Sequence, residues 1–305
     1  MTRKQHAAHK LLEDARNRID QELSQKAVAV LPPMDVHTSA RLLTLAGIQA
    51  QTTVFDPWYN KGVGGERDDY VDYIVGVLKS LEPFSEHLFF WGFPEIIAHF
   101  VNRIPPPLAL RCWVTWFYKN SPSMIRGWRS AQMTCLHLAK PDAKMHVEHF
   151  LNEAQLEKLK QGKLRFIPGP PSVIEEPLLC GFVGRKEQTG HPSQKPVSVI
   201  EKIILMGTER EDLVVDLMSG AGTSAVAARK NERFSIICDI SEEYTLLAEK
   251  RLGTERVRLN EELLRATEHL GSGLKAERFT IPFKNGRLAG KRPRTKGVQL
   301  TIPLK

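Results

Sequence analysis

The stretch Asp56-Pro57-Trp58-Tyr59 has residue types that could hold a reacting amine. The Asp56 carboxylate and the Pro57 carbonyl group are two neighbouring hydrogen-bond acceptors, and proline has no N–H group of its own to compete. If both N–H groups of an amine conjugated to a ring are held, its nitrogen moves toward tetrahedral geometry. The lone pair could then attack an electrophile, with catalysis by positioning and electrostatics. The structural alternative is a turn in which Asp56 caps a strand end and the two aromatic rings pack.

A second stretch, residues 213–223, has the composition of a ligand-binding turn. The apolar run 213–215 leads to Asp216, two glycines follow, and Thr223 opens an alanine-rich helix. The free N–H groups at a helix start attract an anionic group. A further apolar run ends at Asp239, where a carboxylate could accept hydrogen bonds from two ribose hydroxyls. Ligands of open α/β sheets bind at the carboxyl ends of strands, although an ordinary strand–turn–helix is the structural alternative.

Two common nucleotide-binding motifs are absent from this turn. A Gly-Lys-Ser/Thr ending would mark a phosphate-binding loop, and a third glycine at position 225 would complete a dinucleotide fingerprint. Residue 225 is alanine, and no such ending follows the glycines. This favours a nucleoside ligand without a pyrophosphate group, which S-adenosylmethionine (AdoMet) fits.

The glycine turn and a six-residue element upstream of it together resemble the amino-group DNA methyltransferases. Asp-x-x-x-Gly-x-Gly-Thr at 216–223 is followed by the run 233–239, and 191–196 (His-Pro-Ser-Gln-Lys-Pro) is similar to the family's His-Pro-x-x-Lys-Pro element. The match covers residues 52–139 and 191–252, roughly half of the chain. The resemblance implies an AdoMet site that includes His191, Ser193, Lys195, Asp216, Ser219, Gly220, Ala221, Gly222, Thr223 and Asp239.

The order of the motifs places the chain in the permuted β group of that family, in which the target-recognition segment lies between the two halves. The resemblance also implies a third AdoMet-binding acid before Asp56; Asp35 is the candidate, and a helix N-cap is its alternative role. The family pattern at the target site is Asp/Asn/Ser-Pro-Pro-Tyr/Phe/Trp, so Trp58 stands where a second proline is usual. Tyr59 would stack on a base extruded from the duplex. An acid at position 56 favours adenine N6 over cytosine N4.

Hydrophobic periodicity predicts the elements that position these residues. Helices are expected at 8–27, 38–45, 70–80, 94–103, 147–161, 196–206, 222–231 and 241–252, and strands at 51–55, 87–92, 110–118, 132–138, 212–217 and 234–239. This alternation predicts an α/β fold with a doubly wound, mostly parallel, Rossmann-like sheet. We expect an N-terminal helical extension (1–33), a catalytic half (34–139), a small inserted target-recognition segment (140–190), an AdoMet-binding half (191–253), and a helix with a basic C-terminal tail (254–305).

The net charge of +8 originates at the C-terminal end of the chain. Residues 271–305 contain nine Lys or Arg and one acid, so the rest of the chain is balanced. Such a cluster gains affinity for phosphates by counterion release; a solvated tail is the alternative. Base-specific readout is expected from residues 140–190, which contain several lysines. Contacts with DNA are predicted for Lys61, Arg67, Lys119, Arg126, Trp128, Arg129, Lys291, Arg292 and Arg294.

Other features bound the class of protein. No apolar run approaches the roughly 20 residues that cross a bilayer, and the N-terminus lacks an apolar signal core. We therefore expect a cytoplasmic, nucleoid-associated protein with no membrane partner. Four cysteines (112, 135, 180 and 238) lie far apart in apolar runs, which predicts buried free thiols and no metal site.

These features together predict an AdoMet-dependent, site-specific DNA methyltransferase that acts on adenine N6 in a flipped-out base of double-stranded DNA. Cytosine N4 is the nearest alternative. An RNA substrate, or a DNA-binding homologue that has lost turnover because of Trp58, are the others. A homodimer and a restriction endonuclease partner are compatible with the resemblance.

Overall fold

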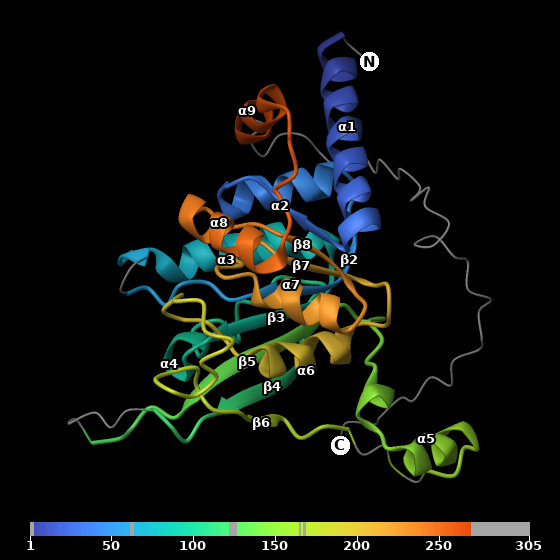
Figure 1. The fold of residues 1–305 in the computed structure, drawn as a ribbon, viewed down its shortest axis with the longest axis vertical. Helices are drawn as coiled ribbons and strands as arrows, with labels where there is room; N and C mark the ends of the chain where they lie inside the picture. The colour runs from blue at the N-terminus through green and yellow to red at the C-terminus, as the bar shows by residue number, and fades with distance from the viewer. Residues whose placement is uncertain (1–2, 62–63, 122–126, 165, 167–168, 270–305) are drawn as a thin grey trace.

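The computed structural model describes residues 3–61, 64–121, 127–164, 166 and 169–269. In this part of the chain one eight-stranded sheet has the strand order β1-β8-β7-β2-β3-β5-β4-β6 (Figure 1). The strands from β1 to β3 in this order are parallel, β5 is antiparallel to β3 and to β4, and β6 is parallel to β4. The strands are β1 (Val28–Val30), β2 (Ala50–Phe55), β3 (Ser85–Gly92), β4 (Ala109–Phe117), β5 (Gln132–Ala139), β6 (Val173–Glu175), β7 (Leu213–Asp216) and β8 (Phe234–Ile237).

Helices cover both faces of the sheet, which is why its central strands are apolar throughout. Successive side chains of a strand point to opposite faces, so Phe55 and Phe90 join one core while Val54 and Phe89 join the other. Helices α1, α2 and α3 pack on the first face, and α6 and α7 on the second, with α8 beside α7. The helices are α1 (Arg3–Lys26), α2 (Val36–Leu45), α3 (Tyr70–Leu81), α4 (Pro94–Ile97), α5 (Glu153–Lys160), α6 (Val197–Gly207), α7 (Thr223–Lys230), α8 (Glu242–Leu252) and α9 (Glu261–His269), with short 3₁₀ helices η2 (Glu82–Phe84) and η3 (Val147–Phe150).

The predicted doubly wound, mostly parallel sheet is confirmed, and three local predictions are wrong. Residues 28–30, for which no strand was expected, form β1 and pair with β8; Val28 and Val30 are buried against α7 and α8, and Ala29 faces the other core. The helix expected at 94–103 ends at Ile97, and turns follow. The helix expected at 147–161 is divided because Asn152 caps α5, accepting a hydrogen bond from the Gln155 N–H group.

Strand direction defines two edges of the sheet. The carboxyl edge holds the residues that follow β2, β3, β4, β6, β7 and β8. Because β5 runs the other way, its last residue lies at the opposite, amino edge, where Ala139 pairs with His87 near the start of β3. The chain therefore leaves β5 at the amino edge, and Figure 1 shows α5 on the far side of the molecule from the carboxyl-edge loops.

Two smaller expectations concern the cysteines and the membrane. Cys135 and Cys238 are buried free thiols, but Cys112 is partly exposed and Cys180 is exposed, so burial was wrongly predicted for these two. Among the described residues, no helix has the length and apolarity to span a bilayer. The proposed division of the chain at 33, 139, 190 and 253 stays a prediction.

Candidate functional site

Asp56 lies at the carboxyl edge directly after β2, and its carboxylate has two partners. One oxygen accepts a hydrogen bond from the Tyr59 hydroxyl at 2.9 Å. The other pairs with the ammonium of Lys195, which also donates to the Tyr59 hydroxyl at 3.1 Å. Burial and the neighbouring Asp56 carboxylate raise the pKa of Tyr59 well above its usual value, so Tyr59 is a neutral donor. A partly exposed acid, a phenol and a buried lysine thus meet where the sequence predicted a target site.

Lys195 was expected in the cofactor site, which stays a prediction; in the structure its ammonium binds the candidate catalytic acid. The Lys195 side chain is 3% exposed and its Nζ lies 5.2 Å from the centroid of the Trp91 ring. A buried ammonium requires compensating charge, which Asp56 supplies. The contact joins residues 139 positions apart in the chain, and neither local motif contained a signal for it.

The turn after Asp56 is held by aromatic packing. Pro57 is buried. The Trp58 ring lies edge-on to Tyr70, with centroids 5.2 Å apart, and the Trp58 carbonyl accepts a 2.6 Å hydrogen bond from the Tyr70 hydroxyl. The Tyr59 ring contacts Phe93 edge-on at 4.8 Å. Trp58 therefore packs toward α3, and this contact supports the turn where the family pattern has a second proline.

The glycine turn lies beside Asp56 because β2 and β7 are parallel neighbours in which Val54 pairs with Asp216. Asp216 is buried and accepts hydrogen bonds from the Ser224 hydroxyl (2.6 Å) and the Met218 N–H group (3.2 Å). Burial raises the pKa of Asp216 to about 7. Gly220 and Gly222 both have positive φ, at 49° and 69°, a region that favours glycine.

Asp239 and Asp35 hold neighbouring turns at the same edge. Asp239 accepts hydrogen bonds from the N–H groups of Gly220 (2.8 Å) and Ser241 (2.9 Å), one on each oxygen. Asp35 is the N-cap of α2 and accepts from His37 N–H (2.9 Å) and Thr38 N–H (3.1 Å). Burial acts to raise the pKa of Asp35, but a hydrogen bond from the Thr38 hydroxyl and these two backbone hydrogen bonds lower it. Its alternative role as a cap is thus observed, whereas contact with a cofactor stays a prediction.

The other predicted cofactor residues surround the turn. His191 stands edge-on to Tyr244 at 4.5 Å, and a Cβ atom on Gly220 would lie only 2.8 Å from its Nε2. The Thr223 hydroxyl, expected to bind an anionic group, accepts a 3.0 Å hydrogen bond from Arg251, a residue that the sequence did not single out. Ala221 is buried, Ser219 is partly exposed and Ser193 is exposed.

The predicted DNA contacts are divided among several loops. Lys61 lies 4.5 Å from the Phe93 ring centroid, Arg67 pairs with Asp69 and Lys119 pairs with Glu175. Trp128 is 98% exposed and Arg129 is exposed beside it. Four further predicted residues lie outside the described part of the chain: Arg126, Lys291, Arg292 and Arg294.

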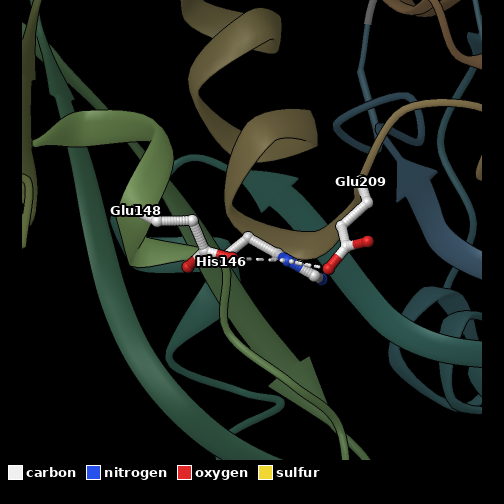
Figure 2. Close-up of side chains that lie close together, drawn as sticks. All are labelled: His146, Glu148 and Glu209. Carbon is white, nitrogen blue, oxygen red and sulfur yellow. Dashed lines mark hydrogen bonds and ion pairs between the residues drawn. The ribbon is translucent and has the colours of Figure 1, made fainter. Parts of the chain in front are cut away.

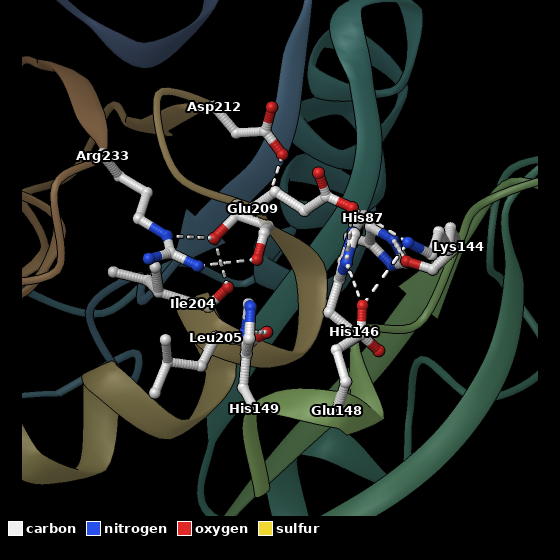
Figure 3. Close-up of polar contacts among 11 residues, drawn as sticks. His87, Lys144, His146, Glu148, His149, Ile204, Leu205, Glu209, Asp212 and Arg233 are labelled. Atoms are coloured by element: carbon white, nitrogen blue, oxygen red, sulfur yellow. Dashed lines mark hydrogen bonds and ion pairs between the residues drawn. The ribbon is translucent and has the colours of Figure 1, made fainter. Parts of the chain in front are cut away.

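A second polar group lies at the amino edge, between the segment after β5 and the loop before β7. Ligand atoms of His146, Glu148 and Glu209 all lie within 4.8 Å of one another (Figure 2), a spacing that could suit a metal ion. The Lys144 ammonium already pairs with both carboxylates, at 2.9 Å from Glu209 and 3.4 Å from Glu148. Arg233, also drawn in Figure 3, donates to the hydroxyl and the carbonyl of Thr208, the residue before Glu209. The lysine supplies the positive charge that a metal would bring, and the expectation of no metal site stays a prediction.

Comparison with known proteins decides the family. Residues 51–250 match the DNA methylase family of N6- and N4-acting enzymes. The chain belongs to this family. The chain is 25% identical to the Type II methyltransferase M.HpaI of Haemophilus parainfluenzae over 66% of its own length and 68% of that protein. It is 30% identical to M1.MboII of Moraxella bovis over 43% of its length, but this match spans only 58% of the relative.

Solved structures confirm the fold of this DNA methylase family member. The crystal structure of the M1.HpyAVI–SAM complex aligns with 74% of the chain and 98% of that protein, with a TM-score of 0.58 and 19% identity.

AdoMet is the cofactor of the family. Here the residues present fit it. Gly220 and Gly222 have the positive φ values that the tight turn before α7 uses, each Asp239 oxygen keeps a free lone pair after one backbone hydrogen bond, and the adjacent Ile240 is 68% exposed, as a side chain that packs under a base would be.

Proposed function

We propose that this protein methylates an exocyclic amino group in double-stranded DNA, with adenine N6 as the acceptor. The observation that carries the proposal is the register of β2 and β7. Because Val54 pairs with Asp216, the Asp56 turn and the glycine turn leave the same edge of the sheet as neighbours. An amine held at Asp56 would then lie next to a cofactor bound at the glycine turn.

The roles of the residues follow from their contacts. AdoMet, when bound, supplies an electrophilic methyl group. Asp239 and the glycine turn would hold its nucleoside, and Ile240 would pack under its base. Asp56 and the Pro57 carbonyl would accept the two N–H groups of the target amine and so direct its lone pair. The Tyr59 hydroxyl already donates to one Asp56 oxygen, so it would compete with the amine for that oxygen.

The carboxylate favours adenine N6 over cytosine N4, since an acid at this position resembles the adenine group. Cytosine N4 is the second candidate, because the matched family includes both activities. A homodimer, a restriction endonuclease partner and a place in the nucleoid remain predictions. The basic tail around residues 291–294 is proposed to bind phosphates.

A transfer assay tests the proposal. Purified protein, tritiated AdoMet and unmethylated genomic DNA are incubated, and the product nucleosides are separated. Label in N6-methyladenine is expected; label in N4-methylcytosine would keep the mechanism and overturn the choice of base. Bound AdoMet with no label in DNA would contradict the proposed substrate.

A variant tests the role of Asp56. Asp56→Ala should reduce transfer about 10²–10³-fold, as for loss of one preorganised polar contact to the reacting group, while AdoMet binding measured by calorimetry persists. Asp72→Ala is the matched control, because Asp72 is an exposed acid in a surface ion pair with Arg103. Equal transfer rates for the Asp56 variant and wild type would refute the mechanism.

A further inference from the structure

The segment expected to read the target sequence, 140–190, is divided between the two edges of the sheet. At the amino edge, the Lys140 N–H group binds the Glu86 carbonyl at 3.0 Å and the His146 N–H group binds the Met206 carbonyl at 2.9 Å. The Lys144–Glu209 ion pair strengthens this attachment (Figure 3). Because β6 is parallel to β4, the chain returns to the carboxyl edge only after Glu175. Of the described residues in 140–190, those from 176 to 190 therefore share an edge with Asp56.

Residues 180–188, which we call the knuckle, form an ordered turn at the carboxyl edge. The Gln188 side chain donates hydrogen bonds to the carbonyls of Gly181 (3.2 Å) and Val183 (2.7 Å). Phe182 is 89% exposed, and the Arg185 guanidinium lies 6.0 Å from the centroid of its ring. The knuckle thus presents an apolar ring and a cation to solvent on a turn that its own hydrogen bonds hold.

A second carboxyl-edge loop is joined to the start of the knuckle, where the Asn120 side chain donates to Cys180 Sγ at 3.3 Å, and to the residues just before it. The Asn120 side chain, just after β4, accepts from the Leu178 N–H group at 2.8 Å and donates to the Leu178 carbonyl at 2.9 Å. Further along the same loop, Trp128 is 98% exposed and Arg129 follows it. Trp128 and Phe182 are the two most exposed large apolar side chains among the described residues. Both are at the edge that carries Asp56, and each has an arginine nearby.

Burying an aromatic ring of this size would release about 1.5–3 kcal/mol relative to leaving it in water. Contiguous exposed apolar patches mark interaction surfaces, whereas single exposed rings are common, so it is the shared position of both rings and their arginines, at the edge that carries Asp56, that marks a surface here. A partner that suits rings next to arginines has flat apolar faces beside negative charges, which is the chemistry of stacked bases and phosphates. Helix α5 lacks this combination: it has two Glu and two Lys and follows the segment attached at the amino edge.

We propose that Phe182 and Trp128 contact the bases next to the extruded nucleotide, that Arg185 and Arg129 bind the flanking phosphates, and that α5 does not read the target. This inference rests on the proposed function, because it takes DNA as the substrate. The knuckle is also joined to the segment that contains Lys195: the Gln194 side chain donates to the Glu187 carbonyl at 2.9 Å, and Lys195 follows directly. DNA bound at Phe182 would therefore contact the same turn that is hydrogen-bonded to Gln194, the residue before Lys195.

Phe182→Ser and Trp128→Ser test the surface, and both side chains are exposed enough for the variants to fold. Phe166→Ser is the matched apolar control, because Phe166 is 75% exposed between α5 and β6. A double variant, Lys158→Ala with Lys160→Ala, tests α5. We measure the affinity for a mixed-sequence duplex by fluorescence anisotropy, the KM for unmethylated genomic DNA in the transfer assay, and the affinity for AdoMet by calorimetry.

Each carboxyl-edge variant should weaken DNA binding or raise the KM for DNA about 5- to 150-fold, the change expected for one lost base–aromatic stack, with AdoMet affinity unchanged. The Phe166 and α5 variants should match wild type. Wild-type DNA binding and KM in both aromatic variants, or weakened binding in the α5 variant, would overturn the inference. DNA affinity is measured separately from methyl transfer. If wild type binds DNA but transfers no methyl groups, the proposed reaction is contradicted, whereas the affinities of the variants still test the proposed surface.

Discussion

Replacing Gly220 with alanine should weaken AdoMet binding while the protein stays folded. Gly220 has a φ of 49°, where a residue with a Cβ atom costs about 1–2 kcal/mol. The new Cβ atom would lie 2.8 Å from Nε2 of His191 and 3.2 Å from its Cε1, so the ring must move. It would then lose its edge-on contact with Tyr244, which contributes about 0.5–1.5 kcal/mol.

Only the His191 part of this cost is specific to the cofactor site. Gly253, after α8, has a φ of 63° and no other residue within 4 Å of the position of a Cβ atom. Gly253→Ala is therefore a matched control that carries the same backbone cost without moving His191. The difference, about 0.5–1.5 kcal/mol, corresponds to a rise in Kd of roughly two- to tenfold.

Calorimetric titration with AdoMet measures the change in affinity, and thermal unfolding checks that both variants stay folded at the temperature of the titration. We expect the Gly220 variant to bind AdoMet more weakly and the Gly253 variant to bind like wild type. Equal affinities in the two variants would mean that the contact between Gly220 and His191 does not shape the cofactor site.

Two further predictions concern the target site and the amino edge. Tyr59→Phe frees one Asp56 oxygen from a hydrogen bond. Because such a bond to a charged group contributes about 1.5–3 kcal/mol, the KM for DNA in the transfer assay should fall roughly tenfold or more. An unchanged or higher KM would instead assign the hydroxyl a direct role in binding. Burial raises the pKa of Asp212 to about 7, although the charge of Arg233 acts to lower it. The protonated carboxyl group therefore contributes to folding stability. This contribution is fully present below a pH of about 4, the pKa of an unfolded Asp, and is lost as the pH rises through about 7. Between about pH 4 and about pH 7 the free energy of unfolding in urea should therefore fall more for wild type than for Asp212→Asn. An equal pH dependence of the unfolding free energy in the two proteins would contradict this.

Most helices and strands could be predicted from the sequence, because periodicity is a local property. The structure has α3 at Tyr70–Leu81 and β5 at Gln132–Ala139, within a residue of the predicted bounds. The strand Val28–Val30 was missed because three residues are too few to show an alternation. Its strand conformation depends on pairing with β8, which follows more than 200 residues later in the chain.

The candidate site was predictable as two separate turns, since an acid before proline and a pair of glycines have characteristic local chemistry. The contacts between the turns were not predictable. Lys195 binds Asp56 across 139 positions, and Arg251 binds the Thr223 hydroxyl across 28. A single sequence contains no local pattern for such pairs, because they depend on strand order and on the path of the chain between elements.

The sequence by itself determined which turns carry chemistry, the alternation of helices and strands, and the resemblance to the DNA methylase family. The tertiary structure decided how these parts meet. Parallel pairing of β2 with β7 brings Asp56 next to the glycine turn, and the reversed direction of β5 takes residues 140–164 to the other edge. The physical reason is that a strand's composition specifies its burial, whereas its neighbours and direction are selected by packing of the whole sheet.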